Sequence, residues 1–191
     1  MLVTLGIVIG VFLVGLLGYA ATRPNTFRVS RRQSIHAPAD RIFDLIGDFH
    51  KWSAWSPYDK LDPTMKKTYS GANSGKGAVY TWAGISKAGE GRMEIIDAVA
   101  PSLLRIKLDF LKPFEGHNTA EFTLEGAGPT DVTWAMYGPQ PYMFKLMSIF
   151  LSMDSIVGKD FAAGLANLKA IAESQSVISI RGSHQCKSTL I

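Results

Sequence analysis

The 191-residue chain is long enough for one domain with a core of its own, and its 47% apolar composition excludes a disordered protein. All 16 acidic residues lie between positions 35 and 173, and with 14 of the 20 Lys and Arg residues they give this span a net charge of −2. The overall charge of +4 therefore comes from the flanks. This excludes a nucleic-acid-binding domain, which needs clustered basic residues on the domain itself.

The chain opens with an uncharged apolar run, residues 2–21 (LVTLGIVIGVFLVGLLGYAA). As a helix, at about 1.5 Å per residue, it is about 30 Å long, the thickness of the hydrocarbon core of a bilayer. Its apolar residues fall all round the helix, which is typical of a transmembrane segment and not of an amphipathic surface helix. We therefore expect residues 1–22 to form a single-pass membrane anchor.

Two questions about this segment stay open. A cleaved signal peptide is the alternative, although the run is longer than a typical signal-peptide core and no basic region precedes it. The side of the membrane is the second question. Arg23, Arg28, Arg31 and Arg32 follow the helix, and the positive-inside rule then favours a cytoplasmic domain. A periplasmic or other extracytoplasmic domain is the alternative, because a single helix without an N-terminal tail tests that rule weakly.

The segment after the anchor begins as a strand. Residues 27–35 alternate between apolar and polar side chains, and residues 36–40 (HAPAD) interrupt the alternation. Pro38 suits the first turn of a short helix over residues 41–46. The stretch that follows carries Trp52 and Trp55, three residues apart, which we expect to close one end of the domain and to contact either its core or a ligand.

The middle of the chain predicts an antiparallel sheet. Period-two segments separated by Gly, Pro, Asn or Asp occur at residues 65–70, 77–83, 91–99, 103–111, 118–124 and 131–138. In residues 104–110 the even positions are apolar and the odd ones charged, so one face of this strand is expected to be dry and the other wet.

The C-terminal part predicts one long helix. Pro141 opens a helical segment that we expect to run to about Glu173, with Asp154, Phe161 and Leu165 on one face. The polar residues 175–191 are expected to form a flexible tail. The whole order predicts an α+β fold for residues 23–174, with a curved antiparallel sheet wrapped around the long C-terminal helix.

Several short motifs occur along this span in a fixed order. They are residues 34–39 (SIHAPA) with Ile42 and Phe43, residues 52–57 (WSAWSP), residues 75–77 (GKG) before residues 80–82 (YTW), residues 130–134 (TDVTW), and Asp160-Phe161, Gly164-Leu165 and Leu168-Lys169 in the last helix. With these motifs the sequence resembles the START-like, helix-grip superfamily, and in particular the polyketide cyclase/dehydrase branch of the SRPBCC proteins. The resemblance implies a hydrophobic cavity between sheet and last helix. Members of the superfamily range from lipid and sterol carriers to cyclases and small regulators, so the fold alone does not predict the function.

The leading hypothesis is a membrane-anchored protein that binds a hydrophobic small molecule or lipid in this cavity, without a cofactor or metal. No protein partner is assigned. The residues expected to line the cavity are those on the apolar strand faces, the tryptophan pair and the start of the last helix. They are Trp52, Trp55, Tyr80, Trp82, Met93, Ile95, Leu104, Ile106, Leu108, Phe122, Trp134, Met136, Met147, Leu151 and Asp154.

Two alternatives remain. The first is a cyclase or hydratase acting on a hydrophobic substrate, with Asp154 or a cavity histidine as general base. His50 and His117 are candidates for such a role, although both are expected to be solvated surface histidines. The second is a structural protein whose interior is filled by its own side chains. No His or Cys group has the spacing of a metal site, and residues 71–76 (GANSGK) lack the spacing of a phosphate loop.

Overall fold

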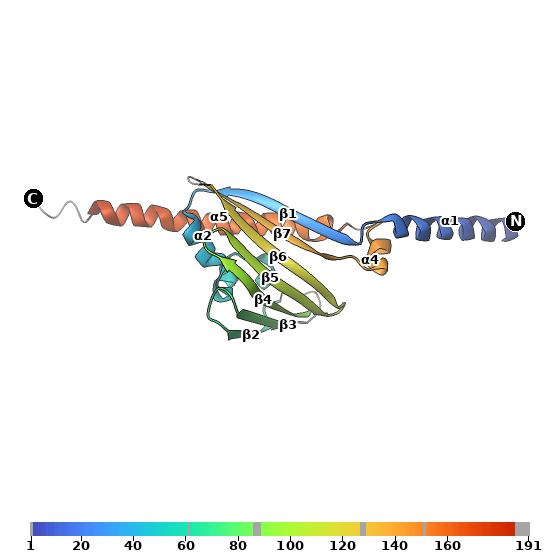
Figure 1. The fold of residues 1–191 in the computed structure, drawn as a ribbon, viewed down its shortest axis with the longest axis horizontal. Helices are drawn as coiled ribbons and strands as arrows, with labels where there is room; N and C mark the ends of the chain where they lie inside the picture. Colours follow the sequence, from blue (N-terminus) through green and yellow to red (C-terminus); the bar gives the residue numbers. More distant parts are fainter. Residues whose placement is uncertain (1, 61, 86–88, 127–128, 151, 186–191) are drawn as a thin grey trace, which may run out of the picture.

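The computed structural model describes residues 2–60, 62–85, 89–126, 129–150 and 152–185 (Figure 1). Within these ranges, side chains are described from residue 3 to residue 174. In chain order the elements are α1 (Leu2–Thr22), β1 (Thr26–Ile35), α2 (Ala39–Ile46), the 3₁₀ turn η1 (Phe49–Lys51), α3 (Trp52–Trp55), the 3₁₀ turn η2 (Pro57–Lys60), β2 (Lys66–Gly71), β3 (Ala78–Ala83), β4 (Glu90–Val99), β5 (Leu103–Lys112), β6 (Gly116–Glu125), β7 (Thr130–Pro139), α4 (Tyr142–Met147) and α5 (Met153–Gln185).

The strands form one antiparallel sheet in the order β1-β7-β6-β5-β4-β3-β2. Every strand that the period-two pattern predicts is present, and the sheet curves around the side on which α5 lies (Figure 1). The predicted α+β helix-grip fold is confirmed. The alternation specifies it because side chains with one parity along a strand share one face of the sheet, and burying that face fixes the register.

The core lies between the concave face of the sheet and the helices. Ile95, Leu104, Ile106 and Phe122 point to this face from the central strands and are fully buried. The first two-thirds of α5 runs along β1 and β7. It contributes a row of buried side chains at alternating steps of three and four, namely Phe161, Leu165, Leu168 and Ala172.

Gly164 is one of the glycines that let α5 approach the sheet closely. A Cβ atom at Gly164 would lie 2.7 Å from the ring of Trp134 on β7. Beside it, the rings of Trp134 and Phe161 stack with centroids 4.1 Å apart and an interplanar angle of 6°. The two layers are therefore in direct contact along this part of α5.

The single helix predicted over residues 141–173 is wrong in two respects. The structure has two helices, α4 and α5, with a break between Met147 and Met153. The Oγ atom of Ser152 accepts a hydrogen bond from the backbone N–H of Ser155 at 3.1 Å, which caps the start of α5 and explains the new beginning. At the other end, α5 continues through Gly182 to Gln185, beyond the predicted end at Glu173. Of the predicted flexible tail, residues 175–191, residues 175–185 belong to α5 and residues 186–191 lie outside the described residues.

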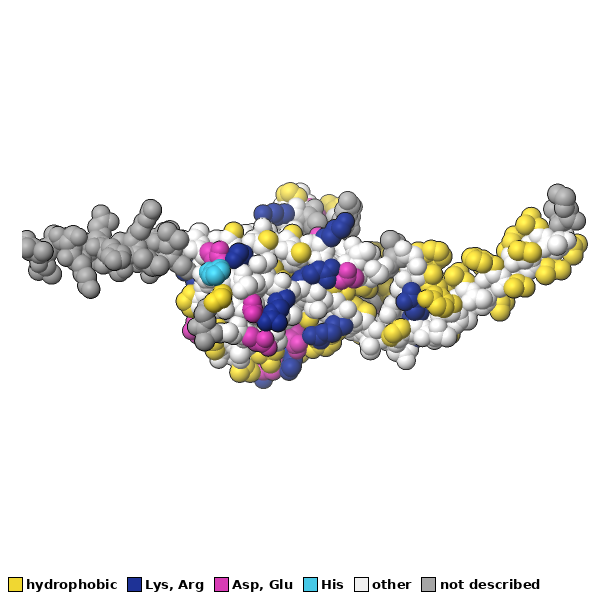
Figure 2. Space-filling view, turned by 90° about the horizontal axis from the view of Figure 1, so that it is seen from above, with side chains coloured by type: hydrophobic (Ala, Val, Ile, Leu, Met, Phe, Trp, Pro, Cys, Tyr) yellow, Lys and Arg dark blue, Asp and Glu magenta, His cyan; other side chains and the backbone are white. Residues whose placement is uncertain are grey.

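The N-terminal helix projects away from the domain (Figure 1). By length and composition Val3–Thr22 can cross a membrane, and among the described residues it is the one helix that meets this condition. Figure 2 shows hydrophobic side chains along the projecting helix and Lys or Arg side chains at its base. Its last turns touch α4, where the hydroxyl of Tyr142 donates a hydrogen bond to the carbonyl oxygen of Leu17 at 2.8 Å.

Candidate functional site

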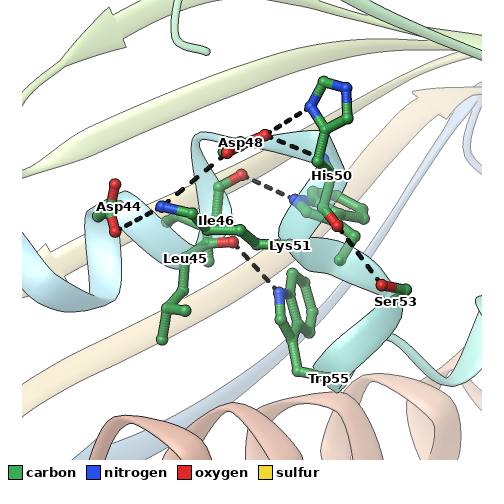
Figure 3. A network of polar contacts seen from close by, with 9 residues as sticks. Asp44, Leu45, Ile46, Asp48, His50, Lys51, Ser53 and Trp55 are labelled. Carbon is green, nitrogen blue, oxygen red and sulfur yellow. Dashed lines mark hydrogen bonds and ion pairs between the residues drawn. The ribbon is translucent and has the colours of Figure 1, made fainter. Parts of the chain in front are cut away.

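The tryptophan pair belongs to the core. The indole N–H of Trp52 donates to the carbonyl oxygen of Ile46 at 2.8 Å, and that of Trp55 donates to the carbonyl oxygen of Leu45 at 3.3 Å (Figure 3). Both carbonyls lie at the end of α2, where the last turn of a helix lacks partners of its own. Both tryptophan side chains are buried, so this stretch joins α2 to the interior.

The polar residues around the pair form a surface network. Asp48 accepts hydrogen bonds from the backbone N–H of His50 and contacts its Nδ1 atom, both at 2.9 Å (Figure 3). Lys51 donates to Asp44 at 2.7 Å. The ring of His50 stacks on Tyr69 with centroids 4.1 Å apart, and more than half of its side chain is exposed. His50 and Lys51 lie on the outside of this network, whereas Tyr69 also packs against Tyr80 of the core.

The predicted cavity residues on the strands are also buried in the core. All of them belong to one hydrophobic cluster, and none lines either of the two pockets described below: Tyr80, Trp82, Met93, Ile95, Leu104, Ile106, Leu108, Phe122, Trp134 and Met136. In this part of the molecule these side chains pack in one cluster with the buried side chains of α5. Ligand contact by these residues and by the tryptophan pair stays a prediction.

A pocket of about 350 Å³ lies where the sheet ends towards α1. It is bounded by the first residues of β1, the β5–β6 connection, the end of β7, α4 and the start of α5. Its apolar side chains are Phe27, Phe110, Phe114, Phe144, Met147, Met153 and Ile156, and its polar ones are Lys112, Glu115, His117, Asn118, Gln140 and Ser148. The volume lies at the lower end of the range for small-molecule sites, roughly 300–1,000 Å³.

The local sequence explains why the pocket forms at this end. Phe110 continues the even-numbered apolar row of β5 beyond Leu108, at the end of the sheet that faces the start of α5 across the pocket. Pro139 is the last residue of β7 and Pro141 follows it; neither has a backbone N–H to donate, so the chain leaves the sheet. Helix α4 then crosses the opening and places Phe144 and Met147 on the pocket.

Of the predicted cavity residues, Met147 lines this pocket. Leu151 lies outside the described residues. Most of the apolar lining was missed by the sequence analysis, in particular Phe27, Phe110, Phe144 and Met153. Phe110 could have been predicted, because it is an even-numbered residue of β5 like the buried Leu108. No sequence pattern indicated that Phe27 lies close to the start of α5.

Asp154 is paired at the surface and lines a second, adjoining pocket of about 270 Å³. Its Oδ1 and Oδ2 atoms accept hydrogen bonds from Nη1 and Nη2 of Arg31, at 2.7 and 3.0 Å. These bonds hold the pKa of the Asp154 carboxyl below its ordinary value. An exposed, ionised and paired carboxylate is a poor general base, and its two bonds to Arg31 fasten the start of α5 to β1. Ligand contact by Asp154 stays a prediction.

A second carboxylate–histidine pair lies at the pocket edge. The Nδ1 atom of His117 lies 2.7 Å from Oδ1 of Asp109, and its Nε2 atom lies 3.3 Å from Oε1 of Glu115. The hydrogen bond to Asp109 raises the pKa of His117 above its ordinary value. Lys107 approaches the other oxygen of Asp109 at 3.1 Å. In the described part of the chain no group of three or more His, Cys, Asp or Glu side chains is arranged to hold a metal ion.

Comparison with known proteins agrees with the fold. A structure of ginseng major latex-like protein 151 from Panax ginseng has 12% identity and a TM-score of 0.57, and the match covers 78% of this chain and 99% of that one. The di-domain ARO/CYC BexL from the BE-7585A biosynthetic pathway has 14% identity and a TM-score of 0.57, with 82% of this chain and 53% of that one covered.

A third similar structure is the Aha1 dimer from Colwellia psychrerythraea, with 13% identity, a TM-score of 0.56 and coverage of 77% and 96%. Identities this low establish the shared fold alone. A search of curated proteins finds no match. The model of the family described as "Polyketide cyclase / dehydrase and lipid transport" matches residues 26–173. The chain therefore belongs to this family, through the whole of the sheet and the part of α5 that packs on it.

Proposed function

We propose that this protein binds a hydrophobic small molecule or a lipid in the pocket between the sheet and α4–α5, and that α1 anchors it in a membrane. The observation that carries the proposal is the pocket of about 350 Å³ with its apolar lining. A cavity of this size lined by Phe and Met side chains stabilises an apolar guest by removing its surface from water. The family description, which includes lipid transport, supports the same class of ligand.

The membrane anchor is supported by the exposure of the apolar side chains of α1. Large apolar side chains such as Val3, Val8 and Phe12 are more than half exposed, although the helix touches the domain at one end. The guanidinium of Arg23 lies 5.2 Å from the centre of the Tyr19 ring, an arrangement that suits the membrane–water interface. An intact mass that includes residues 1–22, measured on protein from the membrane fraction, separates an anchor from a cleaved signal peptide.

The binding test uses the full chain purified in detergent. Lipids extracted from it are identified by mass spectrometry, and the affinity for cis-parinaric acid, a fluorescent acyl probe, is measured. Phe144→Asp places a charge on the pocket wall, and we expect it to weaken probe binding at least about tenfold, which corresponds to about 1.4 kcal/mol. Met143→Asp is the matched control, because Met143 is its neighbour on α4 and does not line the pocket. A wild-type protein that binds neither lipid nor probe would contradict the proposal.

A cyclase or hydratase is the second candidate, and the His117–Asp109 pair at the pocket edge is the observation that favours it. A histidine whose pKa is raised is more often protonated near neutral pH and is suited to donate a proton to a bound substrate. Turnover of a polyketide-type substrate that is lost in His117→Asn, with probe affinity unchanged, would establish this candidate. We expect Asp154→Asn to leave such turnover unchanged, because Asp154 is paired with Arg31 outside the larger pocket.

A further inference from the structure

We infer that the end of the domain next to α1 rests on the membrane, and that the pocket opens there directly into the lipid. The surface concerned, here called the membrane-contact surface, consists of Phe114, Met143, Met147, Phe150 and Ile156. This inference rests on the proposed function, since it names the source from which the pocket takes its ligand.

The membrane-contact surface is apolar and exposed. Phe114, Met143 and Phe150 expose 67%, 66% and 72% of their surface, and Met147 and Ile156 expose about half. Three of the five, Phe114, Met147 and Ile156, also line the pocket, so the exposed surface and the pocket mouth are continuous. Exposed apolar side chains gathered at one place mark an interaction site, whereas isolated ones are ordinary.

Met143 and Phe150, the other two residues of the membrane-contact surface, lie in or directly after α4. Met143 lies one turn before Met147 on the same helix face. Phe150 follows the end of α4, and its backbone N–H donates to the carbonyl oxygen of Met147 at 3.0 Å. The two residues therefore extend the apolar mouth beyond the pocket itself, and neither of them lines it.

The position of α1 decides what lies against this surface. The hydroxyl of Tyr142, the first residue of α4, bonds to the carbonyl oxygen of Leu17, inside the apolar span Val3–Thr22. Leu17 precedes the end of α1 by five residues, or about 7 Å along the helix axis. Ala20, on the next turn, is fully buried where α1 meets the domain. A membrane that contains α1 as far as Thr22 therefore reaches the level of α4.

The connection to the domain is short, which keeps this end near the bilayer. Three residues separate the end of α1 from the start of β1. The basic side chain of Arg23 lies in this connection, where lipid phosphates would meet it. Figure 2 shows hydrophobic side chains where α1 meets the domain, in continuity with those of the helix. A lipid surface fits this arrangement better than a protein partner, because a bilayer that holds α1 already occupies the space beside α4.

This geometry has a consequence for ligand exchange. A ligand that leaves the bilayer beside α4 enters the pocket without passing through water. Exchange should then depend on Met143 and Phe150, which touch the membrane, while the equilibrium affinity of the pocket should not.

The first experiment locates the surface relative to the bilayer. The full chain, in a Cys186→Ser background, is labelled with an environment-sensitive fluorophore at Met143→Cys and reconstituted into phosphatidylcholine vesicles containing phosphatidylglycerol. We expect a blue-shifted emission that is quenched by nitroxide-labelled lipids. Val99→Cys is the matched control, since Val99 is 51% exposed and lies at the opposite end of β4 from the pocket. Equal quenching of both probes by aqueous iodide would overturn the inference.

The second experiment measures the exchange itself. In the same vesicles, loading of cis-parinaric acid from the bilayer is followed by energy transfer from tryptophan. We expect Met143→Asp/Phe150→Asp to slow loading at least tenfold, with wild-type probe affinity in detergent, whereas Val99→Asp loads normally. Loading at the wild-type rate in the double variant would overturn the inference. A wild-type chain that binds no probe in detergent would instead overturn the proposed function, and the Met143 fluorophore would still report where the surface lies.

Discussion

At the scale of single residues, a cluster of aromatic side chains packs the interior between the sheet and the helices. Trp134 lies at the centre: it stacks on Phe122 from the neighbouring strand and on Phe161 from α5. Trp52 and Trp55 reach the same cluster from α3 and use their indole N–H groups to bind the end of α2. One group of rings thus holds the sheet, α2 and α5 together.

The first prediction concerns this ring cluster. Phe161→Ala removes a fully packed ring between α5 and the sheet, and we expect the free energy of unfolding to fall by about 3–5 kcal/mol. The matched control is Ile156→Ala on the same helix, which removes a half-exposed side chain and should cost well under half of that. Urea unfolding of the detergent-solubilised chain, followed by tryptophan fluorescence, measures both. Equal losses would show that Phe161 does not carry this contact.

The second prediction concerns His117 at the pocket edge. The pKa of His117 is raised by its bond to Asp109, so the favourable contact is present below the ordinary histidine value and is lost as pH rises through the raised pKa. Burial works to raise the pKa of Asp109, but the bonds from His117 and Lys107 outweigh it and lower that pKa. The Asp109 contribution is therefore lost when the pH falls through the lowered value.

The pair is thus most stabilising at pH values above the ordinary pKa of an aspartate, about 3.9, and below the ordinary pKa of a histidine, about 6.5. An NMR titration of the His117 ring should show a midpoint above 6.5 in the wild type, moving down in Asp109→Asn. A His117 midpoint that is the same in both proteins would contradict the assigned contact.

At the scale of elements, the division of the C-terminal segment into α4 and α5 creates the pocket. An unbroken helix from Pro141 would continue the line of α5 past the end of the sheet. The break lets α4 turn across the opening, with Lys145 bonded to Asn25 at 2.6 Å in the connection after α1. The ion pair between Arg31 and Asp154 then fixes where α5 begins.

The third prediction concerns the extent of α5 that the domain needs. The buried row of the helix ends at Ala172, and the family match ends at residue 173. A chain that stops after Ser174 should therefore keep the wild-type free energy of unfolding. A chain that stops after Gly164 lacks Leu165, Leu168 and Ala172, and it should not fold, because two buried leucines alone contribute about 2–5 kcal/mol each. Circular dichroism and urea unfolding compare the two; loss of folding in the longer chain would extend the domain into the rest of α5.

At the scale of the whole molecule, α1 extends from one end of the domain along the long axis of the molecule (Figure 1). The apolar pocket lies at the end of the domain where α1 leaves it, and the tryptophan cluster closes the interior away from that end. This placement puts the open part of the fold on the side of the proposed membrane.

The fourth prediction tests the anchor directly. Val8→Lys/Leu13→Lys places two charges within α1, each costing about 2.5–3.5 kcal/mol near the centre of a bilayer. We expect the wild type to remain in the membrane fraction after alkaline carbonate extraction and the double variant to be released. Val99→Lys, on the domain, should behave as the wild type does. Release of the wild-type chain by carbonate would contradict the anchor.

The sequence predicts the strands and the apolar face of α5, but it does not predict where α5 begins. All the strands follow from period-two alternation, because the pleat of a strand sends alternate side chains to opposite faces. The apolar face of α5 follows from its helical spacing for the same kind of reason. The break at Ser152 was missed, since a serine cap among apolar residues is a weak signal beside an otherwise continuous helical pattern.

The sequence by itself determined the fold class, the buried faces of β5, β6 and β7 and the apolar helix that precedes the domain, because these depend on local periodicity and on the length of an apolar run. Only the tertiary structure decided which part of the concave face is filled and which part is open. Phe27 and Phe144 lie far apart in the chain and meet at the pocket because β1 pairs with β7 and α4 crosses the end of the sheet. Such a meeting depends on contacts between distant elements, and no local pattern encodes it.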